Sequence, residues 1–96
     1  MNKIDDYAMA TEIIEEVHRA RKKFPSAEGS MCALTEEVGE LAKATLDESP
    51  QRIRREAIQV AAMAVRVATE GDPSLDAIRC SHGVMPFSEW HDETPA

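Results

Sequence analysis

The chain has 96 residues, of which 43% are hydrophobic and 4% aromatic, and its 18 acidic and 11 basic side chains give a net charge of −7. This length fits one domain with a modest core, and the negative charge opposes binding to nucleic acids or to an anionic membrane surface. The charge does not oppose a small anionic substrate that arrives with a divalent cation, because the cation reverses the local sign.

Helical periodicity predicts a first helix over about residues 5–23, because apolar and charged side chains fall on opposite sides of it. Pro25 ends this helix, since proline disfavours helical geometry in the residue before it, and residues 25–29 then form a loop. The side chains expected on the apolar side are Tyr7, Ala10, Ile13, Ile14, Val17, Ala20 and Phe24.

A second helix is predicted from about residue 30 to residue 48, and Ser49 and Pro50 mark a tight connection after it. Two helices that are joined this closely run antiparallel. The stripe that we expect to be buried consists of Met31, Leu34, Val38, Leu41 and Thr45.

The third predicted helix spans roughly residues 51–70 and stops at Gly71. Between residues 57 and 68 its only polar residues are Gln59 and Arg66, so apolar side chains cover more than half of its circumference. This stretch is too short to cross a bilayer. A helix of this kind is buried on several sides, and the other two helices hardly suffice to cover it. We therefore expect a subunit interface on this helix.

The sequence from residue 72 onward predicts less regular structure. Asp72 and Pro73 have the pattern of an N-cap and a first-turn proline, and predict a short helix to about residue 80. We expect one domain over residues 1–80 and an irregular tail over residues 81–96, in which Met85, Phe87 and Trp90 pin the tail to the body. The expected fold class is all-α, with three main helices plus a short C-terminal helix and tail, completed by oligomerisation.

The two cysteines indicate reduced thiols in a cytoplasmic protein, because they lie far apart and form no CxxC motif. The early acidic residues Asp5 and Asp6 are unlike a signal peptide. Cys80 and His82 are two potential zinc ligands, but no second pair stands at a structural-zinc spacing, so zinc is not expected.

Two polar spacings are the strongest functional signal, Glu37-x-x-Glu40 on the second helix and Glu56-x-x-Gln59 on the polar side of the third. Side chains three apart on a helix are neighbours, so paired carboxylates there repel each other unless a cation lies between them. Across two antiparallel helices these residues would form an all-oxygen site, the chemistry that Mg²⁺ or Mn²⁺ prefers. The alternative is that the glutamates only form a solvated helix face.

The chain resembles the MazG-type nucleotide pyrophosphohydrolases over about residues 5–72. This all-α superfamily also includes dimeric dUTPases, dCTPases and phosphoribosyl-ATP pyrophosphohydrolases. The resemblance rests on LTEEVGELAKA at residues 34–44 and REAIQVAAMA at residues 55–64, which are similar to the EExxE and ExxD signature of the family. The sequence departs from the signature at its last position, where Gln59 stands in place of the aspartate.

The resemblance implies a MazG-like helical bundle that cleaves a nucleoside triphosphate to a monophosphate and pyrophosphate, and that associates as dimers or dimers of dimers. By position, Glu37, Glu40 and Glu56 would hold Mg²⁺, with Gln59 as an uncharged fourth ligand, and Glu36 would be a possible general base beside Glu37. An amide oxygen brings no negative charge, so Gln59 should weaken metal binding. The alternative function is therefore a weakened or inactive nucleotide-binding protein, or a helical oligomeric interaction protein.

Phosphate binding needs cations, and Lys43 and Arg55 are the preferred candidates. Aromatic residues are able to stack on a nucleobase, but core or tail packing is the expected role of Tyr7, Phe24 and Trp90. Nothing in the sequence selects a base or a sugar. The wider set of cations comprises Arg21, Lys22, Lys23, Lys43, Arg54, Arg55 and Arg66.

Overall fold

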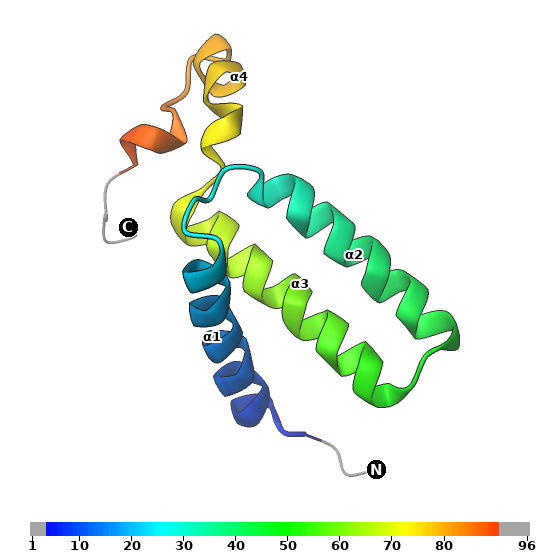
Figure 1. Cartoon of the computed structure of the whole chain (residues 1–96). Helices are drawn as coiled ribbons and strands as arrows, with labels where there is room; N and C mark the ends of the chain where they lie inside the picture. Colours follow the sequence, from blue (N-terminus) through cyan, green and yellow to red (C-terminus); the bar gives the residue numbers. More distant parts are fainter. Residues whose placement is uncertain (1–3, 91–96) are drawn as a thin grey trace.

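The computed structural model describes residues 4–90, and every regular element in this range is helical (Figure 1). The all-α class is therefore confirmed, and the bounds predicted for the three long helices agree with the structure to within one residue. In chain order the elements are α1 (Asp6–Lys23), α2 (Ser30–Asp47), α3 (Pro50–Glu70), the 3₁₀ turn η1 (Pro73–Leu75), α4 (Asp76–Ser81) and the 3₁₀ turn η2 (Phe87–Glu89).

Local capping chemistry explains where the helices begin and end. The Asp5 carboxylate accepts the backbone N–H of Ala8 at 2.7 Å at the start of α1, and a side-chain acceptor of this kind satisfies one of the free N–H groups of a first turn. Ser49 does the same at the start of α3, where Pro50 occupies the first turn. Gly71 ends α3 with a φ of 70°, a conformation that favours glycine.

The central helix of the fold is α3, which packs against α2 on one side and α1 on the other (Figure 1). The tight connection makes α2 and α3 antiparallel neighbours, as predicted, whereas α1 and α2 barely contact each other. No helix within residues 4–90 combines the length and the hydrophobicity needed to span a bilayer.

The buried side of α2 differs from the predicted stripe. Ala44 is fully buried and Ser30 is 4% exposed, but Met31 and Val38 are 38% and 48% exposed, and Thr45 is also exposed. The prediction was wrong because periodicity finds an apolar arc without showing which edge of it meets the neighbour. Small Ala44 lets α2 approach α3 closely, and the helix is rotated so that its larger apolar side chains remain partly uncovered.

The core of the single chain is small. Among the described residues, the buried hydrophobic side chains are only Val17, Ala44 and Ala62. Two residues expected on the apolar side of the first helix, Tyr7 and Ile14, are 88% and 56% exposed. Exposed large apolar side chains also occur on α2, α3 and the C-terminal segment. Apolar surface of this extent commonly marks an interaction site.

Arg66 connects α3 to the end of α1. It is 2% exposed, and its guanidinium donates to the backbone carbonyl of Phe24 at 2.8 Å and to both carboxylate oxygens of Glu70 at 2.9 Å. Hydrogen bonds from Arg66 hold the pKa of Glu70 below its usual range, and Arg21 adds to this effect. Arg66 was among the predicted phosphate cations, but its donors are engaged within the fold.

The C-terminal segment folds back against the end of α3. A side chain at Gly71 would overlap the ring of Phe87, so the glycine permits this close approach. The Arg79 guanidinium lies 4.2 Å from the Phe87 ring centre, and Phe87 and Trp90 stack edge to face at 4.6 Å. Phe87 thus contacts the body, while Met85 is 52% exposed and its carbonyl accepts a hydrogen bond from Arg79. The predicted tail beyond residue 90 lies outside the described residues.

Candidate metal centre

Three of the four residues predicted to form the metal site lie together between α2 and α3. Glu37 and Glu40 come from α2 and Glu56 comes from α3, and one carboxylate oxygen from each lies within 4.8 Å of the others. The ExxE spacing places the first two on adjacent turns of one helix face. The antiparallel arrangement of α2 and α3 then brings the third glutamate to the same point.

Glu56 is the least accessible member of this glutamate cluster. The sequence placed it on the polar side of the third helix, away from the apolar surface, but the residue is 5% exposed because that side of α3 faces α2. Its Oε1 lies 3.3 Å from the Nε of Arg52. Its Oε2 is buried and accepts no hydrogen bond from any residue in the described range 4–90. A buried carboxylate oxygen without a partner is costly, and a cation would remove that cost.

Burial raises the pKa of Glu37, the negative charges of Glu40 and Glu56 raise it further, and a hydrogen bond that protonated Glu37 can donate to the Glu56 carboxylate adds to this effect. These causes are the ones expected when carboxylates share a site without an intervening cation. The donor set is all oxygen and anionic, which suits a hard divalent cation such as Mg²⁺ or Mn²⁺. Gln59 lies one helical turn beyond Glu56, is half-buried, and lines the same pocket as Glu37.

Replacing Glu37 with Gln is expected to stabilise the metal-free protein at neutral pH. Between pH 4.5, the ordinary pKa of this group, and its raised folded pKa, Glu37 binds more protons in the folded state than in the unfolded state. The stability of the wild type therefore falls as pH rises through the folded pKa. The Gln variant avoids this loss, and the two proteins should converge well below pH 4.5. Thermal melting of both proteins in EDTA, at neutral pH and at a pH well below 4.5, measures the difference in stability.

Exposed Glu36 provides the matched control, since Glu36→Gln removes the neighbouring charge without removing a member of the cluster. It should change the melting temperature much less than Glu37→Gln. Added Mg²⁺ should stabilise the wild type and leave Glu37→Gln less affected. Equal melting temperatures for Glu37→Gln and the wild type in EDTA at neutral pH would contradict the repulsion inferred here.

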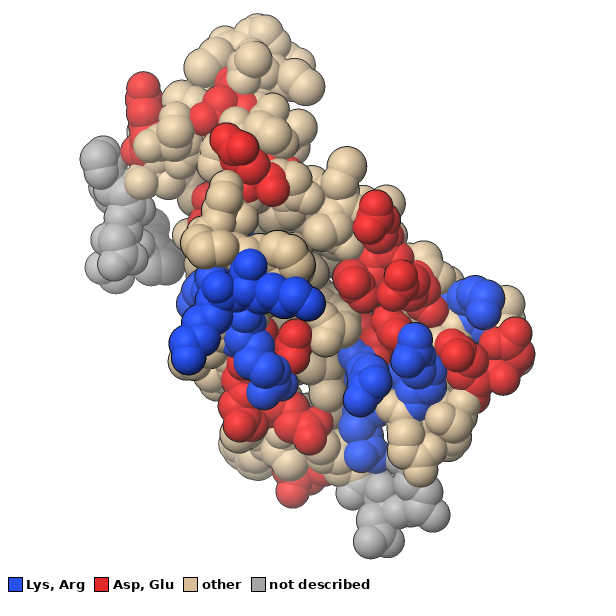
Figure 2. Space-filling model, viewed as in Figure 1, with Lys and Arg blue, Asp and Glu red and all other residues tan. Residues whose placement is uncertain are grey.

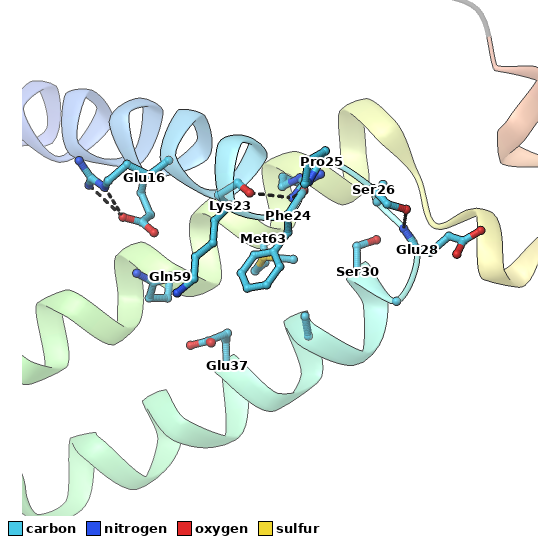
Figure 3. A pocket seen from close by; sticks show the side chains of 16 residues that line it. Glu16, Lys23, Phe24, Pro25, Ser26, Glu28, Ser30, Glu37, Gln59 and Met63 are labelled. Atoms are coloured by element: carbon cyan, nitrogen blue, oxygen red, sulfur yellow. Dashed lines mark hydrogen bonds and ion pairs between the residues drawn. The ribbon is translucent and has the colours of Figure 1, made fainter.

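A pocket of about 920 Å³ opens beside the glutamate cluster, between α1, the loop after it, α2 and α3. Figure 3 shows Glu37 projecting into this pocket from α2, opposite Gln59 on α3. The side chain of Lys23 reaches down from the end of α1 toward Gln59, and the ring of Phe24 lies beside Met63. The pocket therefore combines an acidic edge, a basic group and an apolar wall.

Lys23 is the cation best placed to meet an anion in this pocket. Two other basic residues that line it are engaged elsewhere, because Arg19 pairs with Glu16 at 2.9 Å and Arg66 is held by the fold. Lys23 forms no ion pair with any residue in the described part of the chain. Its ammonium lies 5.5 Å from the ring centre of Phe24, which is 59% exposed. Figure 2 shows basic side chains over the end of α1 and acidic ones over α2, on either side of a strip of uncharged residues.

The other predicted site residues lie outside this pocket. Arg55 is exposed and lines a second, smaller pocket of about 670 Å³ between α1 and α3, which Gln59 also lines. Lys43 is exposed on α2 and lines neither pocket. Glu36 is exposed and does not belong to the glutamate cluster. Their roles in substrate binding and proton transfer stay predictions.

The pocket also contains residues that the sequence did not single out for function. Phe24 was expected to pack in the core, and Lys23 was one of several undistinguished cations. Both line the same pocket as Glu37, because α1 packs against α3 and its C-terminal end reaches that pocket. The run of charges before Pro25 was the available signal, but only the crossing of the helices shows which of those cations faces the glutamates.

Comparison with known proteins adds no relative. No protein-family model, curated protein or solved structure matches this chain. The glutamate cluster and the pocket beside it are therefore the basis for assigning a function.

Proposed function

We propose that the protein is a metal-dependent nucleotide pyrophosphohydrolase of the MazG-like type, which uses Mg²⁺ or Mn²⁺ to cleave a nucleoside triphosphate. The observation that carries the proposal is the buried Oε2 of Glu56, which has no hydrogen-bond partner among the described residues and belongs to a cluster with carboxylates of Glu37 and Glu40. An orphaned oxygen in a cluster of this kind fits a cation ligand better than it fits a solvated surface.

In this proposal Glu37, Glu40 and Glu56 hold the metal, with the Gln59 amide as an uncharged fourth donor. When bound, the metal would polarise the phosphate and lower the pKa of the attacking water. Lys23 binds the triphosphate from the opposite side of the pocket, where its charge offsets the negative charge of the substrate. The exposed ring of Phe24 and neighbouring Met63 offer an apolar surface for the base and sugar.

The reaction in this proposal is hydrolysis at the α-phosphorus. Water forms a new bond to that phosphorus, the bond to the bridging oxygen breaks, and pyrophosphate leaves with the electron pair. The proton lost by the water passes to a carboxylate, for which Glu36 and Glu37 are the candidates. The products are a nucleoside monophosphate, pyrophosphate and one proton.

Incubation of the purified protein with a panel of NTPs and dNTPs, with Mg²⁺ or Mn²⁺, tests this function directly. We expect equimolar release of pyrophosphate and monophosphate from at least one substrate, and none in EDTA. Release of orthophosphate instead would indicate cleavage at a different bond. Absence of pyrophosphate with every substrate and both metals would contradict the enzymatic proposal.

A second candidate function is nucleotide binding without turnover, as a sensor or an oligomeric adaptor. The observation that favours it is the half-buried Gln59, which follows Glu56 by one helical turn, lines the same pocket as Glu37 and carries no charge. Calorimetry that detects nucleotide binding with metal, together with no pyrophosphate release, would support this function. A Gln59→Asp variant that gains activity would show that the missing charge is the cause.

We also propose that the protein is a homodimer or homotetramer. The support is the small core of the single chain and the apolar stretch of α3, where Val65 is 37% exposed. Light scattering at micromolar concentration should give a mass of two or four chains, and Val65→Glu should reduce it by placing a charge in the apolar interface. Ala77→Glu on α4 adds the same charge away from this stretch and should leave the mass unchanged. A monomeric wild type would contradict the proposal.

A further inference from the structure

The α2–α3 pair has no connecting loop at the end where α2 begins and α3 ends. Side-chain hydrogen bonds hold the two helices together there. At the other end the short connection after Glu48 links the two helices, but the start of α2 and the end of α3 are linked through space. There the carboxylate of Asp72 accepts the backbone N–H groups of Gly29 at 2.9 Å and Met31 at 3.0 Å. The hydroxyl of Ser30 donates to the carbonyl of Gly71 at 3.0 Å. These bonds are the direct tie between the start of α2 and the residues that end α3.

Asp72 is well suited to serve as a fixed anchor. It is 2% exposed, and it also accepts hydrogen bonds from the backbone N–H of Ser74 at 3.0 Å and from its hydroxyl at 2.6 Å. Burial by itself would raise the pKa of Asp72, but the hydrogen bonds from Ser74, Met31 and Gly29 outweigh it and hold the pKa below its usual range. A buried, ionised carboxylate with four donors permits little freedom of position.

We propose that Asp72 is a positioning residue of the glutamate cluster, because its bonds to Gly29 and Met31 set the register in which Glu37 and Glu40 on α2 meet Glu56 on α3. The inference rests on the proposed function in one respect, that the cluster binds a metal. Asp72 itself lies outside the cluster and is not a ligand.

The geometry of α2 explains how the anchor reaches the cluster. Glu37 follows Ser30 by seven residues, which on a helix is two turns and about 10 Å. A helix transmits a displacement of its first turn along its axis as a nearly rigid body. Metal ligands must be held within about 0.5 Å of their productive positions. A slip of α2 by a fraction of a turn would therefore separate its two carboxylates from Glu56.

The C-terminal segment packs next to this anchor. Phe87 packs on Gly71, and the carboxylate of Asp76 accepts the backbone N–H groups of Phe87 and Ser88. Asp76 thus holds the C-terminal segment and, within residues 4–90, forms no hydrogen bond or ion pair with α2, whereas Asp72 holds α2 itself. The two aspartates form a matched pair for experiment, since each caps backbone N–H groups and only one of them sets the register.

The test compares the wild type with Asp72→Asn and Asp76→Asn. Calorimetric Mn²⁺ titration is carried out at a temperature at which circular dichroism shows all three proteins folded. We expect Asp72→Asn to weaken Mn²⁺ binding by about tenfold, the scale of outer-shell effects on metal sites, and Asp76→Asn to leave it unchanged. If Asp72→Asn does not fold, Ser30→Ala removes one bond of the same tie and should weaken binding in the same direction, by less.

Amide hydrogen exchange supplies a readout that does not require a metal. We expect Asp72→Asn to accelerate exchange at residues 37–40 as well as at the start of α2, and Asp76→Asn to accelerate it only in the C-terminal segment. If folded Asp72→Asn bound Mn²⁺ like the wild type, or changed exchange only around residues 29–31, Asp72 would have a purely structural role and the inference would be overturned. A wild type that binds no Mn²⁺ would instead overturn the proposed function, and hydrogen exchange would still decide the register claim.

Discussion

Glu56→Gln is expected to lower pyrophosphohydrolase activity by about 100-fold or more while leaving the helical circular dichroism unchanged. The figure follows because loss of an outer-shell partner of a metal ligand already costs about 10–100-fold, and Glu56 is proposed as a ligand. The amide keeps the size of the side chain and can still face Arg52, so the helix should not be disturbed. Initial rates of pyrophosphate release at saturating Mg²⁺ measure the effect.

The stability of Glu56→Gln shows whether Glu56 serves to bind a metal or to stabilise the fold. In EDTA, Glu56→Gln should be at least as stable as the wild type, because it removes a buried charge whose Oε2 has no partner in the described part of the chain. Glu48→Gln is the matched control, since Glu48 also faces Arg52, at 3.8 Å, but lies outside the glutamate cluster. Glu48→Gln should keep full pyrophosphohydrolase activity. Retained activity in Glu56→Gln would show that the glutamate cluster is not the active centre.

Arg66→Ala is expected to lower the free energy of unfolding by roughly 3–5 kcal/mol, the usual cost of removing one partner from a buried ion pair. The substitution would remove the hydrogen-bond donor of the Phe24 carbonyl and the bidentate partner of the Glu70 carboxylate. Domains are commonly stable by only about 5–15 kcal/mol, and this core is small. The variant should therefore be close to unfolded, which urea titration followed by circular dichroism would measure.

Arg21→Ala provides the comparison for this loss. Arg21 pairs with the same Glu70, at 3.1 Å, but its side chain is 40% exposed, so the loss should be at most about 1 kcal/mol. If the two variants were equally stable, the buried position of Arg66 would not be the source of its effect. A large loss of stability in Arg66→Ala would also show that Arg66 helps to hold Phe24 in the wall of the pocket. The guanidinium of Arg66, on α3, donates a hydrogen bond to the backbone carbonyl of Phe24.

The sequence by itself determined the helices and where they end. Each boundary depends on a few adjacent residues, such as Asp5 and Ser49 as N-caps and Gly71 as a stop, and such short-range chemistry can be read along the chain. It also determined that Glu37 and Glu40 share a helix face and that the third glutamate of the cluster, Glu56, follows on the next helix. These features depend only on helical spacing and on a short connection.

Only the tertiary structure decided how those helices are rotated and which side chains meet. Val38 was expected to be buried and is exposed, whereas Glu56 and Arg66 are buried despite their charge. Periodicity describes one helix at a time, but burial depends on the rotation of two helices about their axes, which is set by contacts between residues far apart in sequence. The tie through Asp72 spans more than 40 residues. The packing of α1 against α3, which brings Lys23 into the pocket that Glu37 lines, likewise depends on residues far apart in the sequence.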